Sequence, residues 1–265
     1  MSNKSLKNTI WSFFGSIRCI NLRSRKDRFE QAQSVFTAYS IPVTWFFTDR
    51  HPNGGIQGCF ESHLSCISQS YLKGDETCLI FEDDVVDSVY AKNTKLLQEA
   101  INFMNNNQTW ELFYLGTCPD ILGSKTYSVR SYPSVLNMRS LCTHAYVIHR
   151  RYMEKIIKTS FSNVPIDYIY LFNQQAYGIY PSIFYQRASG SDISGDFWNL
   201  IPVKHLWFRL IEIYAKYINR PIRKIVGILS LGFIMLILLY FINPQLRKIW
   251  LIGTLIFLLI LISSS

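Results

Sequence analysis

An apolar run that stops at three consecutive acids is the feature that most constrains how this chain can fold. Residues 77–81 are bounded by polar residues and are typical of a short buried strand. Glu82, Asp83 and Asp84 follow directly. Three carboxylates this close repel one another unless a cation lies between them. Either they bind a hard divalent cation, Mg²⁺ or Mn²⁺, or they form a solvated exit from the strand with helix-capping acids.

Segments with strand and helix patterns alternate around this run. Strands are expected at 16–22, 43–47, 77–81, 110–115, 145–148 and 182–185. Helices are expected at 27–39, 59–71, 94–104, 152–157 and 168–176. We expect the glycine-rich segment 54–58 to be a tight turn before a helix whose N-terminus could face an anion. The alternation predicts an α/β fold, with a mostly parallel sheet flanked by helices and ligands bound at the C-terminal ends of its strands.

Two long apolar runs occupy the C-terminal part of the chain. The first, 225–242, holds 18 residues without a charge, and as a helix it would span about 27 Å, close to the thickness of a bilayer core. The second, 249–262, is shorter, and a polar turn containing Pro244 separates the two. They predict a membrane helical hairpin, with a buried soluble helical pair as the alternative.

The basic residues of the chain concentrate beside these runs. Residues 201–265 contain eight Lys and Arg, whereas Glu212 is their only acid. Residues 205–219 have the spacing of an amphipathic helix, which would lie along lipid headgroups or pack on the soluble domain. The position of the charge favours a lipid bilayer over nucleic acid as the partner.

The cysteines and the charge distribution bear on location. The six cysteines are scattered and form no close Cys-x-x-Cys pair, so we expect buried free thiols in a reducing compartment. Three basic residues precede the first apolar run, against two in the turn between the runs. Both observations favour a membrane-anchored protein whose folded domain faces the cytosol.

The expected organisation therefore has four parts. They are an N-terminal extension over 1–15, an α/β domain over 16–200, a basic amphipathic segment over 201–224 and a membrane hairpin over 225–265.

Six short motifs, in order and with fitting spacing, resemble one family. They are Ile20-Asn21-Leu22-x-x-Arg25-x-x-Arg28, Gly58-Cys59-x-x-Ser62-His63-Leu64, Leu79 to Val85, Thr143-x-Ala145-Tyr146, Pro165-Ile166-Asp167, and Gln186 with Ser191-Asp192-Ile193. This set resembles glycosyltransferase family 25, which includes bacterial lipopolysaccharide sugar transferases and collagen galactosyltransferases. The resemblance implies a GT-A-like fold, a nucleotide-sugar donor, a divalent metal and transfer with inversion.

The resemblance also assigns roles to residues near the donor. Asp83 and Asp84 are the expected metal ligands, and Glu82 is a ligand or supports one. Asn21, Arg25 and Arg28 are expected near the nucleotide, with solvent-facing charge at a helix start as the alternative for the two arginines. His63 is expected at the donor phosphate, with a hydrogen-bonded core histidine as the alternative.

An inverting transfer needs a base that takes the proton of the acceptor hydroxyl. Asp167 is the expected base because it stands alone in an apolar stretch, where desolvation raises the pKa of a carboxyl. It could instead be the N-cap of a helix starting at Tyr168, and Asp192 is the alternative base.

The sequence thus predicts a membrane-tethered, metal-dependent glycosyltransferase that uses Mn²⁺ or Mg²⁺, a UDP-sugar donor and a hydroxyl-bearing acceptor. A non-catalytic member of the family that binds a sugar or a partner at the membrane is the second hypothesis. A purely structural membrane protein is the third, and it leaves the acidic cluster unexplained.

Overall fold

A computed structural model of the protein describes residues 10–117, 127–140 and 142–187. Its strands are β1 Ser16–Leu22, β2 Thr44–Thr48, β3 Thr77–Glu82, β4 Val85–Asp87, β5 Leu112–Tyr114, β6 Tyr127–Val129, β7 Tyr132–Asn137, β8 Ala145–His149, β9 Ala176–Ile179 and β10 Phe184–Gln186. Its helices are α2 Lys26–Tyr39, α3 Gly55–Lys73, α4 Thr94–Asn106, α5 Arg150–Ile156 and α6 Ile166–Tyr170.

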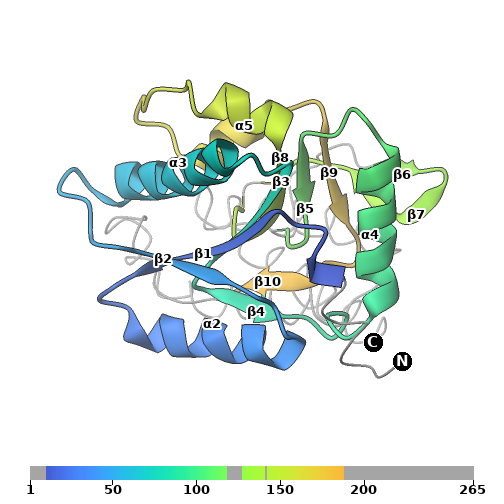
Figure 1. Ribbon diagram of the computed structural model, residues 1–265, viewed down its shortest axis with the longest axis horizontal. Coiled ribbons are helices and arrows are strands. Elements are labelled where there is room, and N and C mark those ends of the chain that lie inside the picture. The colour runs from blue at the N-terminus through green and yellow to red at the C-terminus, as the bar shows by residue number, and fades with distance from the viewer. Residues whose placement is uncertain (1–9, 118–126, 141, 188–265) are drawn as a thin grey trace, which may run out of the picture. The chain divides into compact units, whose positions relative to one another are not determined.

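An eight-stranded sheet forms the centre of the domain, in the order β2-β1-β3-β8-β5-β9-β7-β6 (Figure 1). The β1/β2, β1/β3 and β5/β9 pairs are parallel, whereas β7 and β8 run against each of their neighbours. Most strands therefore share one direction, and the mixed α/β fold with a mostly parallel sheet is confirmed. Strand β3 lies inside the sheet, between β1 and β8.

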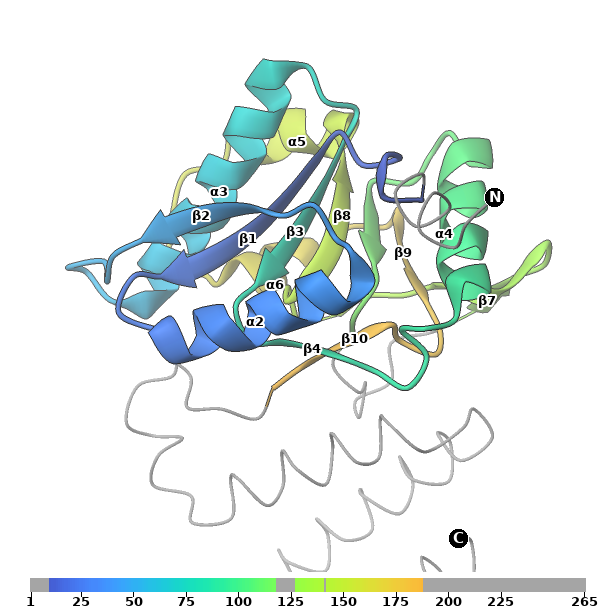
Figure 2. The same ribbon diagram turned by 60° about the horizontal axis from the view of Figure 1, so that its bottom comes forward.

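Helices cover both faces of the sheet. Side chains of α2 and α4 share one core cluster with Leu79 and Phe81 of β3. Side chains of α3, α5 and α6 share the other cluster with Cys78 and Ile80. Successive residues of a strand point to opposite faces, so residues 78–81 of β3 face both core clusters and are all apolar. Figures 1 and 2 show α2 and α3 on opposite sides of β1 and β3.

A small second sheet lies close to the end of β3. Strand β10 pairs with β4 in antiparallel register, with Gln186 opposite Val85. This pairing brings the chain around residue 186 back to the acids, and the backbone N–H of Arg187 donates to the carbonyl oxygen of Asp84 at 2.7 Å.

Several element boundaries differ from the sequence prediction. The segment 55–58 is the first turn of α3 rather than a tight turn. Within 54–58, only Gly54 has a positive φ, 101°. The helix expected at 168–176 instead spans Ile166–Tyr170, and Ala176 begins β9. Pairing of β9 with β5 and β7 places Ala176, the last residue of the expected helix, in the sheet. Strands β4, β6, β7 and β9 were not predicted.

The cysteine prediction is wrong for one described residue. Cys19, Cys59, Cys66 and Cys78 are free, as expected, but Cys142 is disulfide-bonded. A disulfide joins residues that the fold brings together, and the spacing of cysteines along a chain does not reveal this. Because Cys142 is disulfide-bonded, the cysteines no longer favour a reducing compartment. The cytosol-facing location stays a prediction.

The membrane predictions fall on residues that are not described. The amphipathic segment 205–219 and the hairpin 225–265 both lie outside the described residues. Within the described ranges, no helix has the length and apolar character needed to cross a bilayer. At the other end of the domain, Trp11 and Phe14 are buried in the core, so packing begins before residue 16.

Candidate active site

A pocket opens at the C-terminal ends of β1, β2 and β3, where open α/β sheets bind ligands. The residues that line it are Ile20, Leu22, Arg28, Thr48, Asp49, Arg50, His51, Gly54, Gly55, Gly58, Cys59, Ser62, His63, Glu82, Asp83, Asp84 and Gln186. All three acids at the C-terminal end of β3 therefore border a pocket, as the sequence predicts. The glycines belong to the start of α3, where a helix leaves backbone N–H groups unpaired.

The start of α3 approaches the pocket closely because small residues allow it. A Cβ atom on Gly58 would lie 2.9 Å from Cβ of His51, so the β2–α3 loop can fold against the helix only where no side chain intervenes. No side chain caps the helix at Gly54. The first turn of α3 is thus a backbone surface that suits an anionic group of a ligand.

Asp83 is held on both of its carboxylate oxygens. Asn21 Nδ2 donates to Oδ2 at 2.7 Å, and Arg28 Nη1 donates to Oδ1 at 2.9 Å. All three residues are buried. Burial raises the pKa of Asp83 above its usual value against the opposing effect of Arg28 and Asn21. These contacts join the C-terminal ends of β1 and β3 to the N-terminal part of α2.

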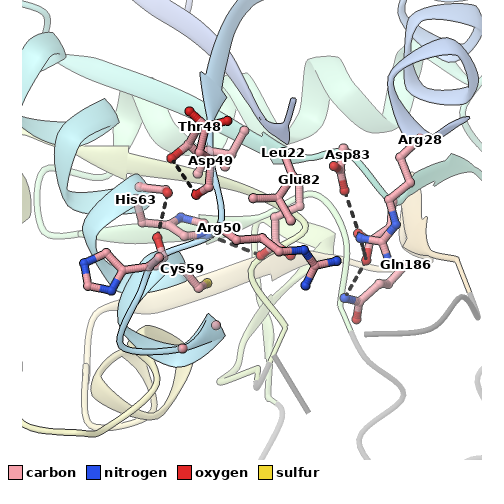
Figure 3. A pocket seen from close by; sticks show the side chains of 17 residues that line it. Leu22, Arg28, Thr48, Asp49, Arg50, Cys59, His63, Glu82, Asp83 and Gln186 are labelled. Carbon is pink, nitrogen blue, oxygen red and sulfur yellow. Dashed lines mark hydrogen bonds and ion pairs between the residues drawn. The ribbon is translucent and has the colours of Figure 1, made fainter. Parts of the chain in front are cut away.

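The two carboxylate oxygens of Asp84 differ in their hydrogen bonding. One has partners, and the other, which we call the open oxygen, has none among the described residues. Its Oδ2 accepts from Gln186 Nε2 at 3.1 Å and lies 3.5 Å from Arg28 Nη1. Its Oδ1 is buried and has no hydrogen-bond partner. Burial and the charge of Glu82 raise the pKa of Asp84 to about 7. Figure 3 shows Arg28 and Gln186 on the Asp83 side of the pocket, away from Cys59 and His63.

Glu82 is oriented by a buried network on the other side. Thr143 Oγ1 donates to Glu82 Oε1 at 2.6 Å, and His63 Nε2 lies 3.4 Å from the same oxygen. The other ring nitrogen of His63 is 2.9 Å from Tyr146 Oη, which in turn is 3.1 Å from Tyr170 Oη. Burial raises the pKa of Glu82, but His63 and Thr143 outweigh it, so the pKa lies below its usual value.

His63 lines the pocket, and its ring contacts the residues of this network. Only 1% of the residue is exposed, and Nδ1 lies within hydrogen-bond distance of Tyr146 Oη, whereas Nε2 is near Glu82 but has no hydrogen-bond partner among the described residues. This arrangement agrees with the alternative of a hydrogen-bonded core histidine and gives His63 a positioning role toward Glu82. The Thr143-x-Ala145-Tyr146 motif also acquires a role, because its first and last residues hold Glu82 and His63.

Asp167 lies beside this network. Burial, and then the negative charge of Glu82, raise the pKa of Asp167 to about 6. Its Oδ1 accepts from the backbone N–H of Tyr168 at 3.0 Å. Asp167 is inside α6, whose N-cap is Pro165, so it is not the N-cap that the alternative interpretation required. It is not among the described residues that line the pocket, and the other expected base, Asp192, lies outside the described residues.

Two further residues complete the comparison with the sequence prediction. Arg25 forms a two-point ion pair with Asp27 and is not among the described pocket-lining residues. Arg50 was not predicted, yet it lines the pocket at the β2–α3 loop (Figure 3). Its position shortly before the glycine-rich segment is the sequence feature that could have identified it as a pocket residue.

The acids do not form a complete metal cage. Within the described residues, no group of three or more His, Cys, Asp or Glu side chains is arranged to hold a metal ion. The open Asp84 Oδ1 nevertheless fits a cation that takes one or two carboxylates from the protein and its remaining ligands from substrate phosphates, as Mg²⁺ usually does.

Comparison with known protein families gives one match. Residues 50–170 match the model of glycosyltransferase family 25, described as an LPS biosynthesis protein. Over this stretch the chain is similar to glycosyltransferase family 25, in agreement with the resemblance found in the sequence. It contains the motifs around His63, Glu82, Thr143 and Asp167, and the protein is a glycosyltransferase.

Two other comparisons add little to this assignment. A crystal structure of a glycosyltransferase involved in glycosylation of the major capsid of PBCV-1 aligns with a TM-score of 0.39 and 13% identity, covering 75% of this glycosyltransferase and 99% of that chain. No curated protein matches the sequence.

Proposed function

We propose that this glycosyltransferase binds a nucleotide-sugar, with UDP as the expected nucleotide, in the pocket at the ends of β1, β2 and β3. The open oxygen of Asp84 carries the proposal, because a buried carboxylate oxygen without a partner is costly unless a ligand satisfies it. Arg50 and the first turn of α3 border the same space and suit a diphosphate.

Mn²⁺ or Mg²⁺ is the proposed cofactor, held by Asp84 and the donor phosphates. Asp83 has both oxygens occupied by Asn21 and Arg28, so its role is to fix the end of β3 rather than to bind the cation directly. When bound, the cation neutralises the charge that develops on the departing diphosphate.

The proposed reaction is a single displacement with inversion. The acceptor hydroxyl oxygen forms a bond to the anomeric carbon while the bond from that carbon to the phosphate oxygen breaks. Asp167 accepts the hydroxyl proton, and its pKa of about 6 leaves it mostly ionised at neutral pH. Glu82, with a lowered pKa, stays anionic and is oriented by Thr143 and His63.

The donor screen that tests this function uses the purified full chain in detergent. Nucleotide sugars are supplied one at a time, with Mn²⁺ or with EDTA, and release of nucleotide is measured. We expect one donor to be hydrolysed in Mn²⁺ and not in EDTA. Equal rates in EDTA would contradict the metal, and failure to bind or hydrolyse any donor would favour the non-catalytic alternative.

A matched pair of arginine variants tests where the diphosphate binds. Arg50→Gln should raise KM for the donor about tenfold or more, because it removes a charged hydrogen-bond donor from the pocket. Arg130→Gln removes the same charge from an exposed position between β6 and β7 and should leave KM unchanged.

A further inference from the structure

A buried arginine already balances the charge of the acidic cluster. Arg28 is 7% exposed, and its Nη1 lies 2.9 Å from Asp83 Oδ1 and 3.5 Å from Asp84 Oδ2. It reaches these acids from α2, while both acids follow β3. The guanidinium therefore lies next to the carboxylate whose Oδ1 has no described hydrogen-bond partner.

A cation on Asp84 and the Arg28 guanidinium would compete for one carboxylate. The open Oδ1 and the Oδ2 facing Arg28 belong to the same group, so a cation there would lie within a few ångströms of a like charge. At that range in a buried site, like charges repel strongly. Arg28 must therefore weaken cation binding as long as it remains on the two acids.

A diphosphate changes this balance. It brings negative charge to the pocket that Arg28 also lines, and its oxygens offer both Arg28 and a cation new partners. We propose that Arg28 couples the two binding events: it holds Asp83 and Asp84 and disfavours a cation in the free enzyme, and it turns toward the diphosphate when the donor binds. This inference rests on the proposed function.

The coupling predicts opposite effects of one substitution. In the full chain at pH 8, Arg28→Gln should bind Mn²⁺ alone about tenfold or more tightly than wild type, because a repelling charge is gone. The same variant should bind UDP more weakly. Arg28→Lys keeps the charge and should resemble wild type in Mn²⁺ affinity.

Lys26→Gln provides the matched control. Lys26 is exposed on the same helix, so its loss lowers the net charge equally without touching the acids, and Mn²⁺ affinity should not change. Electron paramagnetic resonance of free Mn²⁺ gives these affinities. If folded Arg28→Gln binds Mn²⁺ alone no more tightly than wild type, the coupling is wrong.

A measurement on the wild-type chain covers the case in which Arg28→Gln does not fold. The Nε–H resonance of Arg28, assigned by its loss in Arg28→Lys, should move far more with Mg²⁺ and UDP together than with Mg²⁺ alone. An unmoved resonance under bound Mg²⁺ and UDP would overturn the coupling. If wild type binds neither Mn²⁺ nor UDP, the proposed function fails as well, so the two failures are distinguishable.

Discussion

At the scale of single residues, the carboxylates in and beside the pocket have different surroundings. Asp83 is held by two donors, Asp84 keeps one oxygen open, and Glu82 is fixed by Thr143 and His63. Asp167 has a raised pKa and no described cationic partner in an ion pair. Divergent environments of neighbouring acids are how one site holds groups of different protonation.

The raised pKa of Asp167 predicts a pH profile. A base must be deprotonated to accept a proton, so kcat/KM should fall as pH drops through about 6, rather than through the usual value of 3.8. Rates with saturating Mn²⁺ between pH 5 and 8 measure this limb. An acid limb that persists unchanged in Asp167→Asn would transfer the role to another group, with Asp192 the first to examine.

The site was only partly predictable at this scale. The three acids at the end of β3 could be located because an apolar run and its abrupt end are local features of the sequence. Their partners could not, because Arg28 is 55 residues from Asp83 and Gln186 is 102 residues from Asp84. Contacts at such separations are set by strand order and by the β4/β10 pairing, which no spacing in the sequence displays.

At the scale of elements, strongly periodic segments were predicted within a few residues. Strand β1 was predicted with its observed ends, and α2 and α4 with small shifts, because their apolar spacing matches the faces they bury. Strand β7 was missed since Pro133 and a half-exposed pattern hide it. Strand β4 has three residues, too few to show a period.

Gly116 is a point where several elements meet, and it predicts a loss of stability on substitution. It forms a bridge to Phe184 of β10, and an added Cβ would lie 2.6 Å from the Phe184 carbonyl oxygen and closer still to the His144 ring. Gly116→Ala should therefore destabilise the domain by about 2 kcal/mol, as overpacking does.

For a domain of this size, that loss corresponds to a fall in Tm of roughly 4–8 °C. Calorimetry or circular dichroism of the two proteins measures the difference. An unchanged Tm would show that the β5 end, β10 and His144 can separate at little cost, in conflict with the packing described here.

At the scale of the whole molecule, the chemistry is proposed to reside in the α/β domain and the anchoring in residues 225–265. All described site residues lie before residue 188, and the two apolar runs carry no charged side chain suited to catalysis. Membrane anchoring remains a prediction from the sequence alone.

Deleting residues 225–265 should release a domain that is soluble without detergent and still hydrolyses the donor. Sedimentation and nucleotide release, compared with the full chain, check this. If the truncated protein needs detergent, residues 205–219 are a second anchor. If it unfolds, the apolar runs belong to the core of the domain and the anchor interpretation is wrong.

The central claim is that Asp84 serves the donor and its cation while Asp167 serves the acceptor. It is tested most directly by measuring Mn²⁺ affinity, donor affinity and transfer rate in Asp84→Asn and Asp167→Asn, with the exposed Glu30→Gln of α2 as control. Asp84→Asn should weaken Mn²⁺ and donor binding together. Asp167→Asn should leave both nearly unchanged and slow transfer about 10²- to 10⁴-fold. Wild-type Mn²⁺ and donor binding in Asp84→Asn, together with wild-type transfer by Asp167→Asn, would contradict the account.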